Sequence, residues 1–410
     1  MTTPPPPSPP SPPPPSDGPI VSHTPDPADP NRHFVCDRPF DPFAAEVLPE
    51  ARQKELEAGH WRLIWWRLRR HRLAVASGLV LIALYLIVAF AEILAPYAPG
   101  DRNTDFIYAP PQTVRLFHEG RFLGPFVYPF EYHLDMDRLQ RVYAPDTSRP
   151  QPLRFFCSGP EYRFWGLIPG DFHLVCPPEG GTLFLLGTDR LGQDMASRLI
   201  QGTRISMTVG LLGIAVSFVI GLTLGGMAGY FGGWVDTVVQ RAIEILRSLP
   251  ELPLWMALSA AVPVTWSPIA VFFCITLILG LIDWPGLARA VRSKLLALRE
   301  EEYVTAAALM GAKPRRIIAR HLLPNFSSHL IASLTLSVPG MILGETALSF
   351  LGLGLRPPIT SWGVMLTEAQ NIEAVVLYPW LMTPMLAVMV AVLAFNFLGD
   401  GLRDAADPYD

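Results

Sequence analysis

The stretch "EEYVTAAALMGAKPRRIIARHLLPN", residues 301–325, lies between two strongly apolar segments and is itself too polar to cross a membrane. Its alanines favour helix, and Gly311 suits the left-handed residue that ends one. Pro314 fits the first turn of a second helix, which we expect Pro324 to end. The stretch therefore predicts two short helices joined at Gly311 between two membrane spans.

The composition of the whole chain indicates a membrane protein. Of 410 residues, 50% are hydrophobic and only 17% are charged, whereas soluble proteins carry about 25% charged residues. The net charge of −4 gives no reason to expect a nucleic-acid partner. Residues 1–59 begin with a proline run that cannot form helix or sheet, so we expect a disordered tail; a ligand for a proline-binding module is the alternative.

Six segments are candidate spans, since a span needs about 20 mostly apolar residues. They are residues 73–95, 205–229, 235–262, 271–282 with its neighbours, 326–355 and 374–398. The third is the weakest, because it contains prolines and the charged residues Arg241, Glu244 and Arg247. We expect its polar half to be packed inside protein.

Basic residues mark the cytoplasmic side of a membrane protein. One cluster, 62–72, precedes the first span, and a second occupies 289–320. Six spans place both clusters and both termini in the cytoplasm, so we predict an all-α polytopic protein with six transmembrane helices. The domain organisation expected is a tail (1–59), an interfacial segment and first helix (60–95), an extracytoplasmic insert and approach (96–204), and a core of five helices (205–410) that includes the loop 299–325.

Two smaller patterns have alternative interpretations. Cys157 and Cys176 both fall in the insert, where an oxidising compartment favours a disulfide; two free buried thiols are the alternative. Gly221, Gly225 and Gly229 recur every four residues and favour a helix-packing face. The alternative is that glycine is simply common in membrane helices.

Chemistry that converts energy is absent from the sequence. No Gly-Lys dipeptide occurs, which excludes a phosphate-binding loop of the usual type, and no metal-ligand spacing is present. We therefore expect no catalytic activity, no cofactor and no metal in this chain. Glu345 is a lone acid in an apolar span, which indicates a functional residue; the alternative is an interhelical hydrogen bond or the outer end of the span.

The stretch 301–325 resembles the EAA loop of ABC-importer permeases. That pattern is Glu-Ala-Ala, a glycine after three residues, and Ile-x-Leu-Pro after nine more. The positions that match this pattern are Thr305, Ala306, Ala307, Gly311, His321, Leu323 and Pro324, and these together with Tyr303 are the predicted ATPase-coupling residues. Thr305 replaces the glutamate and His321 the isoleucine.

Further segments are similar to the dipeptide/oligopeptide/nickel branch of that family. They are "RHLLPN" (320–325), "GTDRLGQDMASRLIQGTRIS" (187–206), "GYFGGWVD" (229–236), "ETALSFLGLGL" (345–355), "SWG" (361–363) and "DGLRDAADP" (400–408). The resemblance implies the type I ABC-importer permease fold and a C-type permease subunit in a bacterial inner membrane. It also implies a homologous B-type permease, two cytoplasmic ATPases that bind ATP, and an extracytoplasmic solute-binding protein as partners.

Under this resemblance the loop 299–325 is the segment that receives motion from the ATPases. The solute implied is a peptide, with nickel, sugars or a peptide-like antibiotic as alternatives. A secondary transporter would require intramembrane ion-coupling residues or an inverted repeat, and the sequence shows neither. A membrane scaffold would not need six spans with a glycine-packed core.

Overall fold

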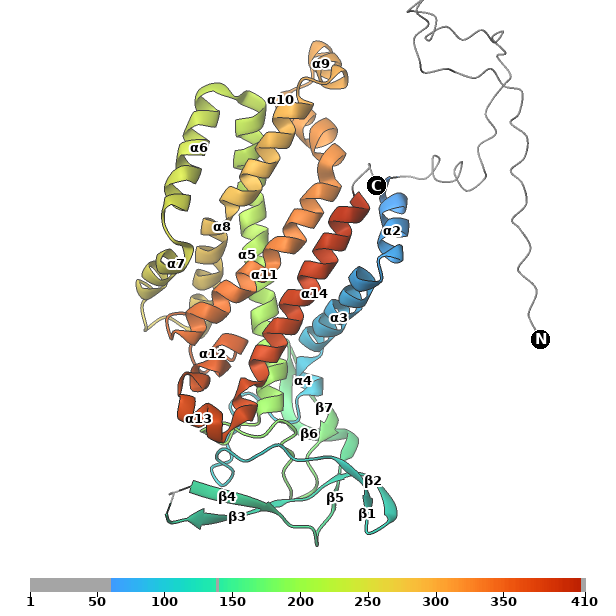
Figure 1. The fold of residues 1–410 in the computed structure, drawn as a ribbon, viewed down its shortest axis with the longest axis vertical. Coiled ribbons are helices and arrows are strands. Elements are labelled where there is room, and N and C mark those ends of the chain that lie inside the picture. Colours follow the sequence, from blue (N-terminus) through green and yellow to red (C-terminus); the bar gives the residue numbers. More distant parts are fainter. Residues whose placement is uncertain (1–59, 138–139, 407–410) are drawn as a thin grey trace, which may run out of the picture. The chain divides into compact units, whose positions relative to one another are not determined.

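The computed structural model describes residues 60–137 and 140–406, and the predicted tail 1–59 lies outside them. Within these residues, five helices are long and apolar enough to cross a membrane, which confirms a mostly helical membrane protein. They are α3 (Arg72–Ala89), α5 (Met195–Phe231), α8 (Pro268–Leu298), the run Pro314–Phe350 that ends in α11 (Ser327–Phe350), and the run Pro379–Ala406 that contains α14 (Thr383–Ala406). Figure 1 shows them side by side.

The predicted third span is two short helices instead of one. α6 (Gly233–Ser248) and α7 (Glu251–Ala260) are separated by Leu249 and Pro250, and neither is long enough to cross a membrane. Leu249 is extended, with ψ 139°, because a residue before proline is forced out of the helical region. Figure 1 shows α6 and then α7 descending beside α8, so the chain still reverses direction here.

The polar face of α6 is not packed inside this chain. Arg241 and Glu244 form an ion pair of 2.7 Å, but their side chains are 73% and 54% exposed. This polar half is therefore exposed on the chain itself, and its expected packing inside protein stays a prediction that a partner subunit would fulfil.

The beginning of α3 and the end of α14 lie together. A Cβ atom on Gly401 would lie 2.3 Å from the Cβ of Ala74, and His71 approaches Asp404 at 3.9 Å. The amphipathic helix α2 (His60–Arg70) packs on α14 beside this contact. The chain therefore makes an even number of passes, with the α6–α7 pair as the broken one. We call this end of the fold the α9 end, after the helix described below.

The core is built around α5, which packs most extensively on α8. Gly221, Gly225 and Gly229 all face that helix: a Cβ atom on Gly225 would lie 2.5 Å from the carbonyl oxygen of Ala288. Only glycine permits so close an approach of two helix backbones. On the other side α11 and α14 pack on each other, and α3 packs on α14.

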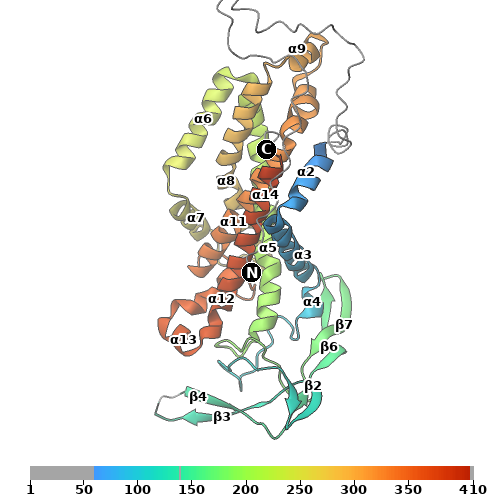
Figure 2. The ribbon, with the colours of Figure 1, turned by 45° about the vertical axis from the view of Figure 1, so that its right-hand side comes forward.

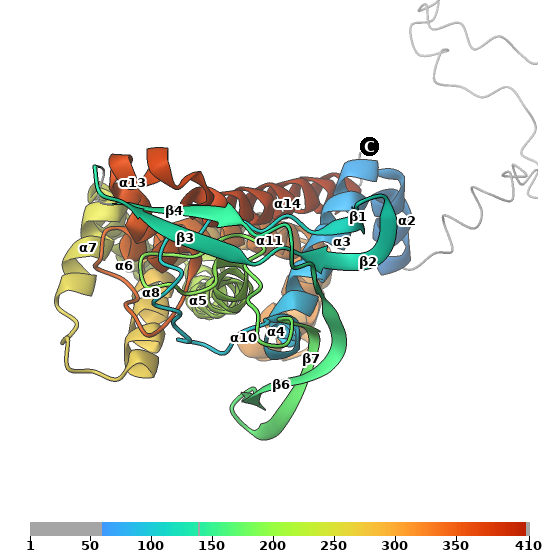
Figure 3. The same cartoon turned by 90° about the horizontal axis from the view of Figure 1, so that it is seen from below.

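The insert is made of β-strands, whereas the sequence predicted an all-α chain and left the insert's fold open. All three sheets are antiparallel, and Figure 3 shows them across one end of the helices. They pair β1 (Arg115–His118), β2 (Arg121–Val127) and β5 (Gln151–Pro152); β3 (Phe130–Asp135) and β4 (Gln140–Pro145); and β6 (Arg154–Phe164) and β7 (Ile168–Cys176). We call this the insert end.

The hairpin of β6 and β7 carries a disulfide between Cys157 and Cys176. It lies beside α4 (Ala91–Leu94), the short helix that follows α3, as Figure 2 shows. Two further short helices complete the insert end: α12 (Trp362–Leu366), which packs on α5, α11 and α14, and α13 (Ile372–Leu377).

Candidate functional site

The predicted loop forms a protruding helix, α9 (Glu302–Leu309), which ends as expected at a left-handed glycine. Gly311 has φ +81°, and its N–H donates to the carbonyl of Ala308. The N–H of Ala312 donates to the carbonyl of Ala307. No atom lies within 4 Å of where a Cβ on Gly311 would be, so the position needs glycine for its backbone and not for space.

Pro324 does not end the second helix, which corrects the sequence prediction. α10 (Pro314–Arg316) leads into a π-helical turn (Ile317–Leu322), a 3-10 turn (Leu323–Phe326) and then α11 without a break. The wide π turn lets the N–H of Leu323 reach the carbonyl of Ile318. Proline lacks an N–H, and this change of helical pitch accommodates it inside a continuous helix.

The rear of the loop is anchored in an apolar cluster. Val304 and Ala307 of α9 are buried, as are Ile317 and Leu322 of the π turn. They pack against residues of α8, including Leu295. The loop is therefore fixed to the membrane helices, because packed side chains transmit a force on α9 to α8 and α11.

The side of the loop that faces away from the membrane helices is exposed. Thr305 and Ala306 are exposed on α9, and Leu309 and Met310 at its end are 84% and 82% exposed. Such prominent apolar side chains next to alanines form a narrow knob that could enter a groove on another protein.

Three of the predicted coupling residues lie together beside the knob. Tyr303, His321 and Pro324 line one shallow depression, where the amide of Asn325 donates to the Tyr303 hydroxyl at 3.2 Å. Leu323 is half-buried behind them.

The loop carries basic side chains that the described part of the chain leaves unpaired. Lys313, Arg315, Arg316 and Arg320 are exposed and form no ion pair with any described residue. By contrast, Arg299 pairs with Glu300 at 2.9 Å. The segment 313–320 thus presents positive side chains that no described residue neutralises, whereas the exposed acids Glu301 and Glu302 lie at the start of α9.

Glu345 lies at the other end of α11 and is fully buried. Its carboxylate accepts hydrogen bonds from Ser206 on α5 at 3.0 Å, Ser349 on α11 at 2.8 Å and Ser361 before α12 at 2.7 Å. All three donors belong to this chain, so of the two interpretations of Glu345 the geometry favours the interhelical hydrogen bond.

The hydroxyls around Glu345 extend the network into the segment "SWG". Ser361 accepts from the N–H of Val364 and so caps α12. The backbone N–H of Trp362 donates to Ser206, and its indole donates to Thr203. Two segments more than 140 residues apart in sequence are thus held together by one buried carboxylate.

A second polar network lies at the start of α5. Asp189 is fully buried; it accepts from the N–H groups of Leu191 at 2.7 Å and Gln193 at 2.8 Å and pairs with Arg198. Arg198 also approaches Glu368 at 3.5 Å. This arrangement explains the segment "GTDRLGQD" structurally, as a turn closed by its own aspartate.

Asp194 caps α5 from the same turn, accepting from the N–H of Ser197 at 2.7 Å. Its other carboxylate oxygen is buried and has no hydrogen-bond partner among the described residues. Burial raises the pKa of Asp194 to about 6, and nearby Asp189 adds to the rise.

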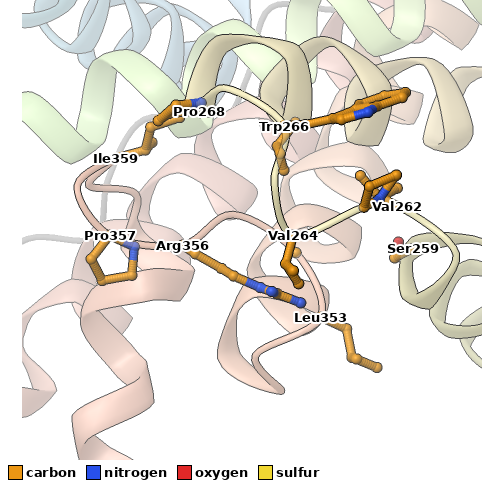
Figure 4. A pocket seen from close by; sticks show the side chains of 12 residues that line it. Ser259, Val262, Val264, Trp266, Pro268, Leu353, Arg356, Pro357 and Ile359 are labelled. Carbon is orange, nitrogen blue, oxygen red and sulfur yellow. The ribbon is translucent and has the colours of Figure 1, made fainter.

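A small cavity lies at the insert end between the loop after α7 and the loop after α11 (Figure 4). Arg356 extends across it, between Val264 and Leu353. The cavity has a volume of about 120 Å³, enough for a few water molecules but not for a peptide.

The predicted residues therefore fall into separate places. Tyr303, His321 and Pro324 come together at the α9 end, the three glycines line the α5–α8 contact, and Glu345 and the disulfide belong to the insert end. The sequence reasoning missed the roles of Asp189, Arg198 and Ser361. The segments that contain them were noticed only as resemblances, and nothing in their spacing shows that they meet.

Comparison with known proteins places the chain among transport proteins. Residues 221–409 match the family described as binding-protein-dependent transport system inner membrane component. Residues 59–111 match the N-terminal transmembrane domain of oligopeptide transport permease C.

Individual relatives are similar over most of the chain. A glutathione transport system permease protein of Pectobacterium atrosepticum is 32% identical over 362 residues, covering 88% of this chain and 95% of that one. A dipeptide transport system permease protein of Bacillus subtilis is 40% identical over 234 residues, covering 57% and 70%. Among solved structures, the methionine ABC transporter MetNI in an inward-facing conformation matches with a TM-score of 0.41 and 21% identity, covering 52% of this chain and 97% of that one.

Proposed function

Since this chain belongs to the family of binding-protein-dependent transport system inner membrane components, we propose that it carries peptides across the bacterial inner membrane as the C-type permease of an ATP-driven importer. It forms half of the translocation pathway. Two ATPase subunits bind ATP and drive the cycle, a homologous B-type permease supplies the other half of the pathway, and a solute-binding protein delivers the peptide.

The observation that carries this proposal is the form of the α9 end. The knob made by Leu309 and Met310 is exposed, whereas the rear of α9 is fixed to α8 and α11 through Val304 and Ala307. A segment that is open on one side and rigidly backed on the other transmits a partner's movement to the membrane helices. The unpaired basic side chains of 313–320 suit a partner surface that carries acidic groups.

The orientation of the chain in the membrane follows from the basic residues at the α9 end. The start of α3, the end of α14 and α9 all lie at the α9 end, together with the basic clusters. Basic residues favour the cytoplasm, so we place α9 and both termini inside and the disulfide-bearing insert outside.

The peptide substrate is supported by the relatives. Their names describe transport of glutathione, dipeptides and oligopeptides, all of which carry peptide or peptide-like bonds.

The test replaces Gly311 with valine in the complete transporter. A β-branched residue at φ +81° is strained by about 1–2 kcal/mol, which displaces α9 relative to α10 without any steric clash. We expect peptide uptake by proteoliposomes to fall at least about tenfold while ATP hydrolysis continues, because the energy of hydrolysis no longer reaches the pathway.

The matched control is Gly120→Val in the turn between β1 and β2. Gly120 has φ +80° and also has no atom within 4 Å of its Cβ position, so the strain is the same but the place is the insert. Normal uptake in Gly311→Val, or equal loss in both variants, would count against the coupling assignment. Measuring uptake of a labelled peptide against labelled nickel tests the substrate class separately.

A further inference from the structure

The helix α3 carries an exposed apolar stripe that ends next to the insert. Leu79, Ile82, Leu86 and Phe90 are exposed and recur at helical spacing on one side of the helix. α3 is one of the candidate spans, and its opposite side packs on α14 and α5. The stripe therefore faces the hydrocarbon of the bilayer.

The tip of the β6–β7 hairpin continues this stripe. The ring of Phe90, the last member, lies 6.4 Å from the ring of Phe164 at the end of β6. Beyond it, Leu167 is 81% exposed and Ile168 is 63% exposed. Figure 2 shows the hairpin rising beside α4 toward the end of α3.

Trp165 holds the tip of the hairpin beside the end of α3. Its indole N–H donates to the carbonyl of Ala89, the last residue of α3, and its backbone N–H donates to Glu92, both at 3.1 Å. The guanidinium of Arg204 on α5 lies 4.5 Å from the centre of the indole ring. Three contacts, from α3, α4 and α5, therefore hold one side chain.

The backbone of the tip is strained, which indicates that its position matters. Trp165 has φ +51° and Gly166 has φ +74°, as in a tight hairpin turn. A bulky residue rarely adopts that conformation. The contacts to Ala89, Glu92 and Arg204 offset the strain, and such strain is retained where a side chain must be presented in one direction.

Charge on the hairpin stops before the tip. Glu161 and Arg163 on one strand and Asp171 on the other are exposed, whereas residues 164–168, "FWGLI", carry no charge. The disulfide joins the two strands near the base of the hairpin, and a hydrogen bond of 2.9 Å between His173 and the carbonyl of Ala95 holds the hairpin to the end of α4. A rigid hairpin thus presents an apolar, tryptophan-containing tip at the end of a membrane span, with its charges behind it.

We propose that the tip of the β6–β7 hairpin, residues 164–168, is immersed in the bilayer interface at the insert end. Lipid is the occupant because the tip is continuous with the lipid-facing stripe of α3, and because tryptophan is the residue enriched at this depth. The hairpin then acts as a second membrane anchor that keeps the other sheets of the insert at a fixed height above the pathway.

The test measures the lipid contact directly in the assembled transporter in nanodiscs. In a background where Cys36 and Cys274 are replaced by alanine, Leu167→Cys is labelled with an environment-sensitive fluorophore. Phosphatidylcholine carrying a quencher near its headgroup is included in the disc. The matched control is Phe122→Cys, another exposed apolar side chain of the insert, on β2, a strand that Figure 1 shows farther from α3 than the β6–β7 hairpin.

We expect a blue-shifted emission at position 167 and several-fold stronger quenching than at position 122. Equal, weak quenching at both positions would overturn the proposal. A blue shift at 167 without lipid quenching would also overturn it, because it would show that a protein partner covers the tip. Neither readout depends on transport, so the result is independent of the proposed substrate and coupling.

Discussion

The two ends of this protein treat their polar groups in opposite ways. At the insert end, buried Asp189 and Glu345 find every partner within the chain, across segments from α5 to α12. At the α9 end, the basic side chains of 313–320 and the apolar tip of α9 have no partner among the described residues. A polar group satisfied internally stabilises the fold, whereas an unsatisfied surface backed by a rigid core is available for another protein.

The largest expected effect is that of Asp189→Ala at the insert end. It removes the buried partner of Arg198 and the acceptor of two backbone N–H groups. Breaking a buried pair from one side costs about 3–5 kcal/mol. We expect little folded protein, measured as a strong fall in apparent melting temperature or in the yield of assembled transporter.

Two controls separate charge from position. Asp189→Asn keeps an acceptor for the N–H groups and should lose less stability than alanine. Arg190→Ala removes only the ion pair with Glu368, 3.8 Å long, whose arginine side chain is 62% exposed, and such a pair is worth less than about 1 kcal/mol. If Arg190→Ala were as damaging as Asp189→Ala, the contrast between buried and exposed groups would fail.

Glu345→Ala is the next largest change. It leaves the hydroxyls of Ser206, Ser349 and Ser361 without their shared acceptor, at a cost of about 2 kcal/mol or more. We expect a lower melting temperature, and a partial recovery in Glu345→Gln because the amide oxygen still accepts. Full stability of the alanine variant with uptake abolished would instead point to a direct role in transport.

A smaller, pH-dependent effect is expected at Asp194. Because its pKa is raised to about 6 from an ordinary value of 3.8, the folded protein binds a proton between these values that the unfolded chain does not. Stability from this group is therefore fully present below about 3.8 and is lost as pH rises through about 6. The melting temperature of the wild type relative to Asp194→Asn should rise between pH 7 and pH 5, and parallel curves would contradict the raised pKa.

The smallest expected effect lies at the α9 end. Thr305 occupies the position of the family's glutamate and is exposed, with the exposed Glu301 and Glu302 one turn earlier. Thr305→Glu should leave the melting temperature unchanged and change coupled ATP hydrolysis by no more than about twofold, because those acids already supply negative charge near the knob. A tenfold gain would show that Thr305 limits coupling.

The sequence predicted the spanning helices where hydropathy alone decides them. The apolar runs around α3, α5, α8, α11 and α14 need no knowledge of their neighbours, because any run of that length is stable in lipid only as a helix. The third pass was predicted as one span, but the break at Pro250 divides it into α6 and α7. The strands of the insert were not predicted; β3, FEYHLD, does alternate apolar and polar residues, but β1 and β2, RLFH and RFLGPFV, do not.

For the candidate sites, the sequence predicted those features that depend only on neighbouring residues. Gly311 ends α9 because the left-handed backbone belongs to one residue and its neighbours, but Pro324 does not end the next helix, since a π turn absorbs it. The glycine spacing indicated a packing face without saying that α8 fills it.

The sequence by itself determined that this is a membrane protein of the importer-permease family, with a helical, basic loop between two spans. These properties depend on length, hydropathy and short motifs, all of which are read along the chain. Only the tertiary structure decided that Glu345 joins α5, α11 and α12, that Asp189 closes its own turn on Arg198, and that Trp165 sits on the end of α3. Each of these contacts joins groups whose meeting is set by how helices and strands pack, and that packing is not encoded in any one segment.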